Sequence, residues 1–135
     1  MRLKTKQKIE EYGLRLDEKI KKIDHLDYTE SIKLLNESAF ACVDSGGLQE
    51  EASALHTPCM TMRYVTDRPE TVEIGCNVLT TLEFPKMKSA YEKLKKNYDE
   101  MSKKKCPYGE GDSASQIIEF IEKRKDSLIR WAGKI

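Results

Sequence analysis

A serine followed by two glycines, at the end of an apolar run, is the first feature of this sequence that could do chemistry. Ser45, Gly46 and Gly47 follow Val43 and Asp44, and helix-forming residues come directly after them. The first amides of a helix have no carbonyl partner and carry about half a unit of positive charge, and glycine lets an oxyanion approach them closely. The turn therefore indicates an anion-binding site, with the Ser45 hydroxyl as a further donor. The alternative is a tight turn in which Asp44 or Ser45 only caps the helix.

Two charged residues farther along suggest what the anion belongs to. Glu51 lies four residues after Gly47, so both face the same side of the helix. A carboxylate beside an oxyanion site suits a nucleotide, because it accepts hydrogen bonds from both ribose hydroxyls. Arg68 lies at the start of a second helix and can offer a planar fork to a diphosphate. The alternatives are a solvated glutamate and a surface arginine paired with Glu70 or Glu73, but the joint order of these residues favours a nucleotide site.

The elements that position these residues alternate between strands and helices. Residues 39–43 form a continuous apolar run of strand length, typical of a parallel strand covered on both faces. Residues 58–62 indicate the next buried strand, and 77–79 a short third one. Helices are expected from the glycine turn to about residue 55 and from Pro69, whose missing amide costs nothing in a first turn, to a stop at Gly75.

Further elements flank this alternating segment. Before it we expect a weakly amphipathic helix over 4–14, a short strand over 20–23, and a helix behind Asp27 and Glu30, which have capping-box spacing. After it, a long helix begins at Pro85, and a last helix follows the loop at 107–111. In that last helix we expect four apolar side chains to face inward: Ile117, Phe120, Ile121 and Leu128.

This order predicts an α/β fold, with a Rossmann-like parallel sheet between helices. Ligands of such sheets bind beyond the carboxyl ends of the strands, where both turns lie. The 135 residues suffice for a single domain, 1–135. The 24 basic and 23 acidic residues nearly cancel, so we expect binding to neither nucleic acid nor membrane. Because the sequence has no apolar run of membrane-spanning length and its amino terminus is too charged for a secretory signal, a soluble, cytoplasmic protein is expected.

The cysteines indicate neither a metal site nor a disulfide framework. No two of them lie within three residues of each other: they are Cys42, Cys59, Cys76 and Cys106. Zinc sites need closer pairs, and disulfides are rare in the cytosol. We therefore expect free thiols, with Cys42 and Cys59 buried as small hydrophobes, and no metal ion or other cofactor.

The two turns lie within longer strings that resemble one enzyme family. The string D-S-G-G-L-Q-E-E-A at 44–52, followed by M-R-Y-V-T-D-R-P-E-T-V-E-I-G at 62–75, resembles the carboxyl-terminal signature of the non-hydrolysing UDP-N-acetylglucosamine 2-epimerases. The loop at 107–111 and the segment from Asp27 are also similar, and the resemblance runs from about Lys4 to Ile118. Members of this family interconvert UDP-N-acetylglucosamine and UDP-N-acetylmannosamine, by a proposed elimination and re-addition of UDP.

The resemblance implies an incomplete carboxyl-terminal, nucleotide-sugar-binding domain of a two-domain fold of the glycosyltransferase-B type. It assigns the diphosphate to Ser45, Gly46 and Gly47, the ribose to Glu51, a place in the same nucleotide site to Arg68, and the uracil to the backbone around Leu26 and Ser31. Ser31 stands where the family usually has an aromatic residue, which alters the expected packing of the uracil.

The groups that catalyse the family's reaction have no counterpart in this sequence. The acid/base carboxylates of the amino-terminal domain and the histidine of an H-R-x-E-N motif are not present, and His25 and His56 are expected to be surface or turn residues. We therefore assign no catalytic residue and expect this chain alone not to epimerise.

The expected partners are UDP or a UDP-N-acetylhexosamine, a separate amino-terminal domain chain, and a second copy of this chain. Two alternatives remain. One is a non-catalytic UDP or UDP-sugar-binding module. The other is a structural or assembly role, in which an exposed sheet edge and an apolar face promote self-association.

Overall fold

The computed structural model of the chain describes residues 3–132, except for the side chains at 126, 128 and 130–132. Its elements in chain order are α1 (Leu3–Glu11), α2 (Tyr28–Asn36), β1 (Ala41–Val43), α3 (Gly46–Ala54), β2 (Cys59–Met62), α4 (Pro69–Glu73), β3 (Asn77–Thr80), α5 (Phe84–Lys96), α6 (Tyr98–Met101) and α7 (Ser113–Ala132).

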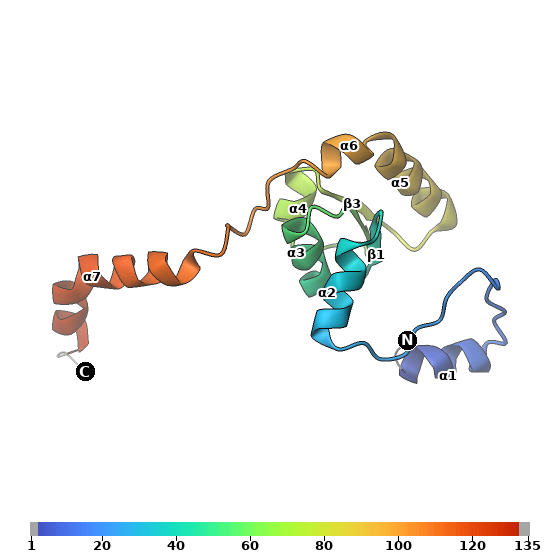
Figure 1. Cartoon of the computed structure of the whole chain (residues 1–135), viewed down its shortest axis with the longest axis horizontal. Coiled ribbons are helices and arrows are strands. Elements are labelled where there is room, and N and C mark those ends of the chain that lie inside the picture. The colour runs from blue at the N-terminus through green and yellow to red at the C-terminus, as the bar shows by residue number, and fades with distance from the viewer. Residues whose placement is uncertain (1–2, 133–135) are drawn as a thin grey trace.

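Three parallel strands in the order β1-β2-β3 form the centre of the molecule (Figure 1). Ala41 is paired with Cys59, and Cys59 in turn with Asn77, so the strands start almost level. The crossovers that parallel strands require are α3 and α4, and the carboxyl ends of all three strands therefore meet at one edge. The predicted α/β fold with a parallel sheet is confirmed.

Helices cover both faces of the sheet, and each layer has its own apolar cluster. The helices α2 and α3 close one face over Leu35, Ala41, Val43, Ala52 and Cys59. On the other face, α5 and α6 pack over Met60, Ala90, Leu94 and Met101. Because apolar burial is the main favourable term in folding, these two clusters hold α3, and the turn at its start, in a fixed place on the sheet.

Two local signals in the sequence are confirmed at helix ends. The Asp27 Oδ1 atom accepts a hydrogen bond from the Glu30 amide at 2.8 Å, and Glu30 Oε2 accepts one from the Asp27 amide at 3.1 Å, which is a complete capping box. Pro69 is the first residue of α4, and Gly75 follows the end of that helix with a φ of +87°. That left-handed conformation favours glycine, so the helix stops there.

Two expectations about strands are wrong. Residues 20–23 form no strand, and Lys21 and Lys22 are exposed, because two adjacent lysines leave no face of a strand that could be buried. Cys42 is exposed rather than buried, whereas Cys59 is buried as expected. Cys42 lies in the edge strand β1, while α5 packs against β2 and β3.

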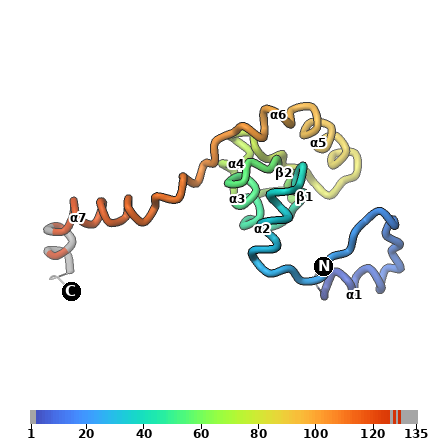
Figure 2. The backbone as a smooth tube through the Cα atoms, viewed as in Figure 1, coloured from blue at the N-terminus to red at the C-terminus, as the bar shows by residue number. Residues whose placement is uncertain are grey.

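The last helix also departs from the expectation. α7 extends away from the sheet at the end of the segment that follows α6, as the ribbon and the tube both show (Figures 1 and 2). Ile117, Phe120 and Ile121 do not face inward: their exposed fractions are 58%, 53% and 48%. The side chain of Leu128 lies outside the described residues. The spacing of the apolar residues correctly predicts a helix, but no other described element packs on its apolar side chains.

Candidate nucleotide site

The Ser45 turn connects β1 to α3 at the carboxyl edge of the sheet. Ser45 is the N-cap residue of α3, with extended backbone (φ −98°, ψ 134°), yet its side chain makes no capping hydrogen bond. The first bond inside the helix runs from the Gln49 amide to the Ser45 carbonyl, at 3.3 Å. The amides of Gly46, Gly47 and Leu48 therefore precede the helical ladder and remain donors for a ligand, together with the Ser45 hydroxyl.

A cavity of about 680 Å³ opens beside this turn. Four residues predicted for the site line it together: Leu26, Ser31, Ser45 and Glu51. Leu26 precedes α2 and Ser31 lies in its first turn, so α2 and α3 form two of the walls, and Thr5 of α1 contributes to a third. The volume lies within the range of roughly 300–1,000 Å³ that is usual for small-molecule sites.

Three of the predicted residues, Gly46, Gly47 and Arg68, are not among those that line the cavity. A Cβ atom at Gly47 would meet only the Ser45 hydroxyl, at 4.0 Å, so the surroundings of this glycine are open. A Cβ atom at Gly46 would lie 2.9 Å from Asp67 Oδ2, and the Asp67 carboxylate would have to move. The side chain next to Gly46 is therefore the Asp67 carboxylate, from the loop that carries Arg68.

Arg68 occupies the N-cap position of α4, and its guanidinium contacts two acidic residues, Glu50 and Asp67. Its Nε donates to Glu50 Oε1, its Nη1 donates to the Asp67 carbonyl at 2.7 Å, and Nη1 lies 3.6 Å from Asp67 Oδ2. The hydrogen bond to Glu50, followed by the charges of Glu50 and Asp67, raises the pKa of Arg68. The alternative partners named from the sequence, Glu70 and Glu73, are wrong: the arginine is paired, but with Glu50 and Asp67.

Arg63 completes a small charged group at the start of α3. Its Nη1 lies 3.5 Å from Asp67 Oδ1, so one carboxylate lies between two guanidinium groups. All three side chains are partly exposed, which means that solvent screens these pairs and each contributes little to stability. With Glu50, which accepts from Arg68, the group contains two arginines and two acids and places both guanidinium groups near the start of α3.

Sequence reasoning missed several contributors to the site. Asp27, Tyr28, Asp44 and Leu48 line the cavity, and the aromatic ring of Tyr28 is 70% exposed beside Ser31. The signal was available, since Tyr28 and Ser31 are three residues apart on one helix and must share a face. Outside the cavity, sequence reasoning also missed a contact of Tyr108, whose hydroxyl donates to Glu70 Oε2 at 3.3 Å and so attaches the loop at 107–111 to α4. Burial, then the negative charge of Glu70, raises the pKa of Tyr108 to about 12, so it stays a donor.

The two histidines lie in the surface and turn positions that the sequence predicted. His25 is exposed before α2. His56 lies in the turn after α3 with a φ of +56°, and its Nδ1 is 3.1 Å from the Lys104 carbonyl. Among the described residues, no group of three or more histidine, cysteine, aspartate or glutamate side chains could hold a metal ion. No helix in the same part of the chain is long and apolar enough to cross a membrane.

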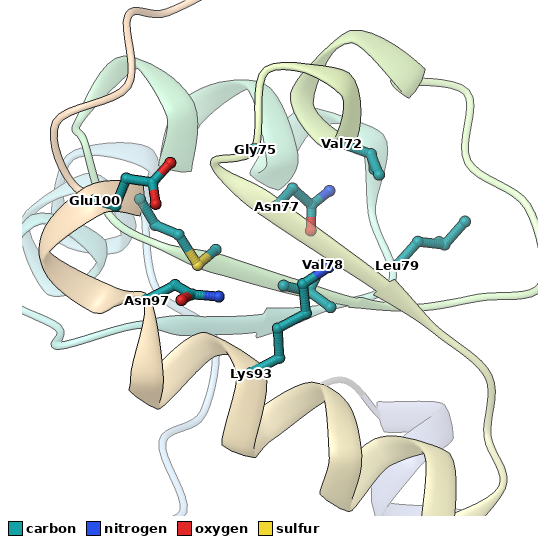
Figure 3. Close-up of a pocket in the computed structure, with 9 residues that line it drawn as sticks. Val72, Gly75, Asn77, Val78, Leu79, Lys93, Asn97 and Glu100 are labelled. Atoms are coloured by element: carbon teal, nitrogen blue, oxygen red, sulfur yellow. The ribbon is translucent and has the colours of Figure 1, made fainter.

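A second depression, of about 250 Å³, lies along β3 and next to α5 and α6. Figure 3 shows Lys93, Asn97 and Glu100 approaching it from these helices, with Asn77 and Val78 on the strand. None of the predicted site residues lines it. The Asn77 amide donates to Gln49 and to Thr71, so it is already used inside the fold. The nucleotide interpretation therefore depends on the cavity at the Ser45 turn.

Comparison with known proteins gives the same family as the motifs. Residues 2–122 match the family model for UDP-N-acetylglucosamine 2-epimerase. The UDP-N-acetylglucosamine 2-epimerase of Methanocaldococcus jannaschii is 36% identical over 125 residues, which are 87% of this chain and 32% of that protein. Its crystal structure in complex with UDP-GlcNAc and UDP superposes with a TM-score of 0.76 at 34% identity, covering 90% of this chain and 34% of that one.

A structure of S. aureus MnaA with UDP superposes with a TM-score of 0.78 at 28% identity, over 95% of this chain and 36% of that chain. This chain thus spans about a third of the length of the relatives that it matches. The three parallel strands correspond to part of the glycosyltransferase-B-like fold of these epimerases. With nine-tenths of its residues inside the family model, the chain belongs to the UDP-N-acetylglucosamine 2-epimerase family.

Proposed function

We propose that this chain binds UDP, or the UDP portion of a UDP-N-acetylhexosamine, as the carboxyl-terminal nucleotide-binding part of an epimerase. The observation that supports this most directly is the single cavity shared by Leu26, Ser31, Ser45 and Glu51, which come from two separate segments of the chain, 26–31 and 45–51. Relatives with the same fold were crystallised with UDP-GlcNAc and UDP.

Each predicted residue has a role that its position allows. The Ser45 hydroxyl and the first amides of α3 bind the diphosphate, because they are donors without a partner inside the helix. Glu51 faces the cavity one turn later and accepts the ribose hydroxyls. The uracil lies between the segment at Leu26 and the start of α2, next to Tyr28. Arg68 reaches the diphosphate by giving up its contact with Asp67, whose carboxylate lies next to Gly46.

Calorimetric titration with UDP tests this proposal. We expect Ser45→Ala and Glu51→Gln each to weaken binding by about 1–3 kcal/mol, the usual cost of losing a hydrogen bond to a charged or buried partner. Matched controls are Ser115→Ala and Glu73→Gln, which alter exposed residues in the first turn of α7 and at the end of α4. Undetectable binding at millimolar UDP by the folded wild-type chain would refute the proposal.

We also propose that the chain alone does not convert UDP-N-acetylglucosamine to its epimer. Abstracting and returning a proton at the second carbon of the sugar requires a positioned acid and base, and the carboxylates around the cavity, Asp27, Asp44 and Glu51, flank the expected nucleotide rather than the sugar. Proton NMR of UDP-N-acetylglucosamine incubated with the purified chain in heavy water checks this. Epimer formation or deuterium at that carbon would contradict it.

A second candidate function, docking of further epimerase polypeptide, is supported by α7. Its apolar side chains lie exposed on a helix that projects from the sheet. The S. aureus structure superposes over 95% of this chain, so most of α7 lies in the matched region of a protein nearly three times as long. We propose that the stripe made by Ile117, Phe120 and Ile121 packs on the part of the epimerase polypeptide that this chain does not cover, whether that part is joined to it or is a separate chain.

A further inference from the structure

Gln49 is a buried amide directly behind the Ser45 turn, and it connects three elements. Its side chain is 1% exposed. Its Nε2 donates to the Ser45 carbonyl at 3.2 Å, while its Oε1 accepts from Thr66 Oγ1 at 2.6 Å and from Asn77 Nδ2 at 3.2 Å. A buried polar group is costly unless its hydrogen bonds are made, so these contacts restrict how α3, the loop after β2 and β3 lie relative to one another.

The connection continues from Gln49 to the backbone of Arg68. The Arg68 amide donates to Thr66 Oγ1 at 3.1 Å, and the hydroxyl that accepts this bond is the one that donates to Gln49. On its other side, the Arg68 carbonyl accepts from Thr71 Oγ1 at 2.8 Å, and that hydroxyl accepts from Asn77 Nδ2 at 3.0 Å. Both backbone groups of Arg68 are therefore attached, through one threonine each, to the Gln49–Asn77 pair.

The neighbouring residue of α3 holds the other part of Arg68. Glu50 accepts a hydrogen bond from the Arg68 guanidinium, so residues 49 and 50 together fix the arginine's backbone and its side chain. A glutamine is needed at position 49 because the site requires both a donor, toward the Ser45 carbonyl, and an acceptor, toward Thr66 and Asn77. A glutamate could not donate and a leucine could do neither.

We propose that Gln49 is a positioning residue that, through Thr66, sets the distance between the Ser45 turn and Arg68, so that both reach one diphosphate. This inference rests on the proposed binding of UDP. It adds that the two turns act as one unit, whose backbone geometry is fixed before the ligand arrives, while the Arg68 side chain still moves away from Asp67. Pre-positioned groups lose less freedom on binding, and a change in the buried hydrogen bonds should therefore alter affinity without altering any group that touches the ligand.

The test compares the loss of a hydroxyl at the partly exposed Thr66 with the loss of a hydroxyl at the buried Thr57, at the other end of the sheet. Thr66→Val removes the hydroxyl between Gln49 and Arg68. The control, Thr57→Val, removes a buried hydroxyl that donates to the Leu35 carbonyl at 3.2 Å, just before β2 and away from the site. We expect Thr66→Val and Gln49→Leu to raise the Kd for UDP about tenfold, the effect of roughly one lost hydrogen bond, and Thr57→Val to leave it unchanged at a similar loss of thermal stability.

A double-mutant cycle separates positioning from a general loss of structure. If Thr66 acts through Arg68, then Thr66→Val should have little further effect on the Kd in the Arg68→Ala background. Equal effects in both backgrounds, or equal Kd values for Thr66→Val and Thr57→Val, would overturn this inference while leaving UDP binding intact. Failure of the wild-type chain to bind UDP would instead refute the proposed function. Should Gln49→Leu fail to fold, Thr66→Val, a near-isosteric change at a partly exposed residue, decides the matter alone.

Discussion

At the scale of single residues, one acid lies next to the groups that we propose to bind the diphosphate. The Asp67 carboxylate lies against Gly46 and next to the guanidinium groups of Arg63 and Arg68. It therefore repels an incoming diphosphate and competes with it for both arginines. We predict that Asp67→Asn lowers the Kd for UDP about three- to tenfold, since a charge at this distance in a partly exposed site is worth about 1 kcal/mol.

The measurement is a UDP titration at low and high salt. The gain should shrink as ionic strength rises, because screening weakens the interaction between exposed charges. Asp99→Asn, an exposed carboxylate on α6, is the control and should change nothing. An unchanged or higher Kd for Asp67→Asn would mean that this carboxylate helps to shape the site rather than competing with the ligand.

The sequence predicts some of these residues well and others poorly, for a physical reason. Gly47 and Glu51 are four residues apart on α3, so the helical repeat alone puts Glu51 on the side of the glycine turn, and Glu51 lines the cavity together with Ser45. Arg68 and Glu50 are 18 residues apart and meet only because α3 and α4 pack side by side. Which acid pairs with an arginine is decided by that packing, and no local pattern contains it.

At the scale of elements, α7 makes the clearest prediction. Phe120→Glu together with Ile117→Glu should abolish association with the remaining two-thirds of an epimerase polypeptide, for example that of the M. jannaschii relative expressed as a separate chain. Placing two carboxylates on an apolar contact surface costs several kcal/mol of binding, because the charges must be desolvated there. Co-elution on a sizing column, with and without the substitutions, measures the effect.

Glu122→Lys, on a residue between the apolar positions of α7, is the control and should leave co-elution intact. The competing occupant is a second copy of this chain. If the chain self-associates in the absence of the remaining polypeptide, and the double substitution makes it monomeric, α7 binds α7 and the docking proposal fails.

The elements differ in how far the sequence could define them. Continuous apolar runs predicted β1 and β2, and the caps at Asp27 and Gly75 predicted where α2 begins and α4 ends. The pattern in α7 was equally regular, yet a helical repeat reports only that a face is apolar, not which surface covers it. The exposure of Cys42 was missed for the same reason, since burial of a strand depends on how far the helical layer extends.

At the scale of the whole molecule, binding of UDP should stabilise the fold. A ligand that binds only the native state adds RT ln(1 + [L]/Kd), which is about 2.7 kcal/mol at a hundredfold excess over Kd. For a domain of this size we predict a rise in Tm of roughly 10 °C at that concentration. Differential scanning calorimetry measures it. Uridine, which lacks the diphosphate, is the control and should give a much smaller shift in Tm. Equal shifts for UDP and uridine would show that the Ser45 turn does not bind the diphosphate.

The position of β1 at the border of the sheet has a thermodynamic consequence. Because no strand lies beyond it in the described structure, the adjoining cavity is bounded there by Thr5 of α1 and by exposed residues such as Tyr28 and Asp44. A nucleotide held there stays partly hydrated, and its attraction to nearby cations is weakened by water. A polypeptide that excludes water from this side of the cavity strengthens that attraction and so raises the affinity for the nucleotide. By thermodynamic reciprocity, the bound nucleotide raises the affinity for that polypeptide by the same factor. Nucleotide binding and association with further polypeptide are therefore thermodynamically coupled.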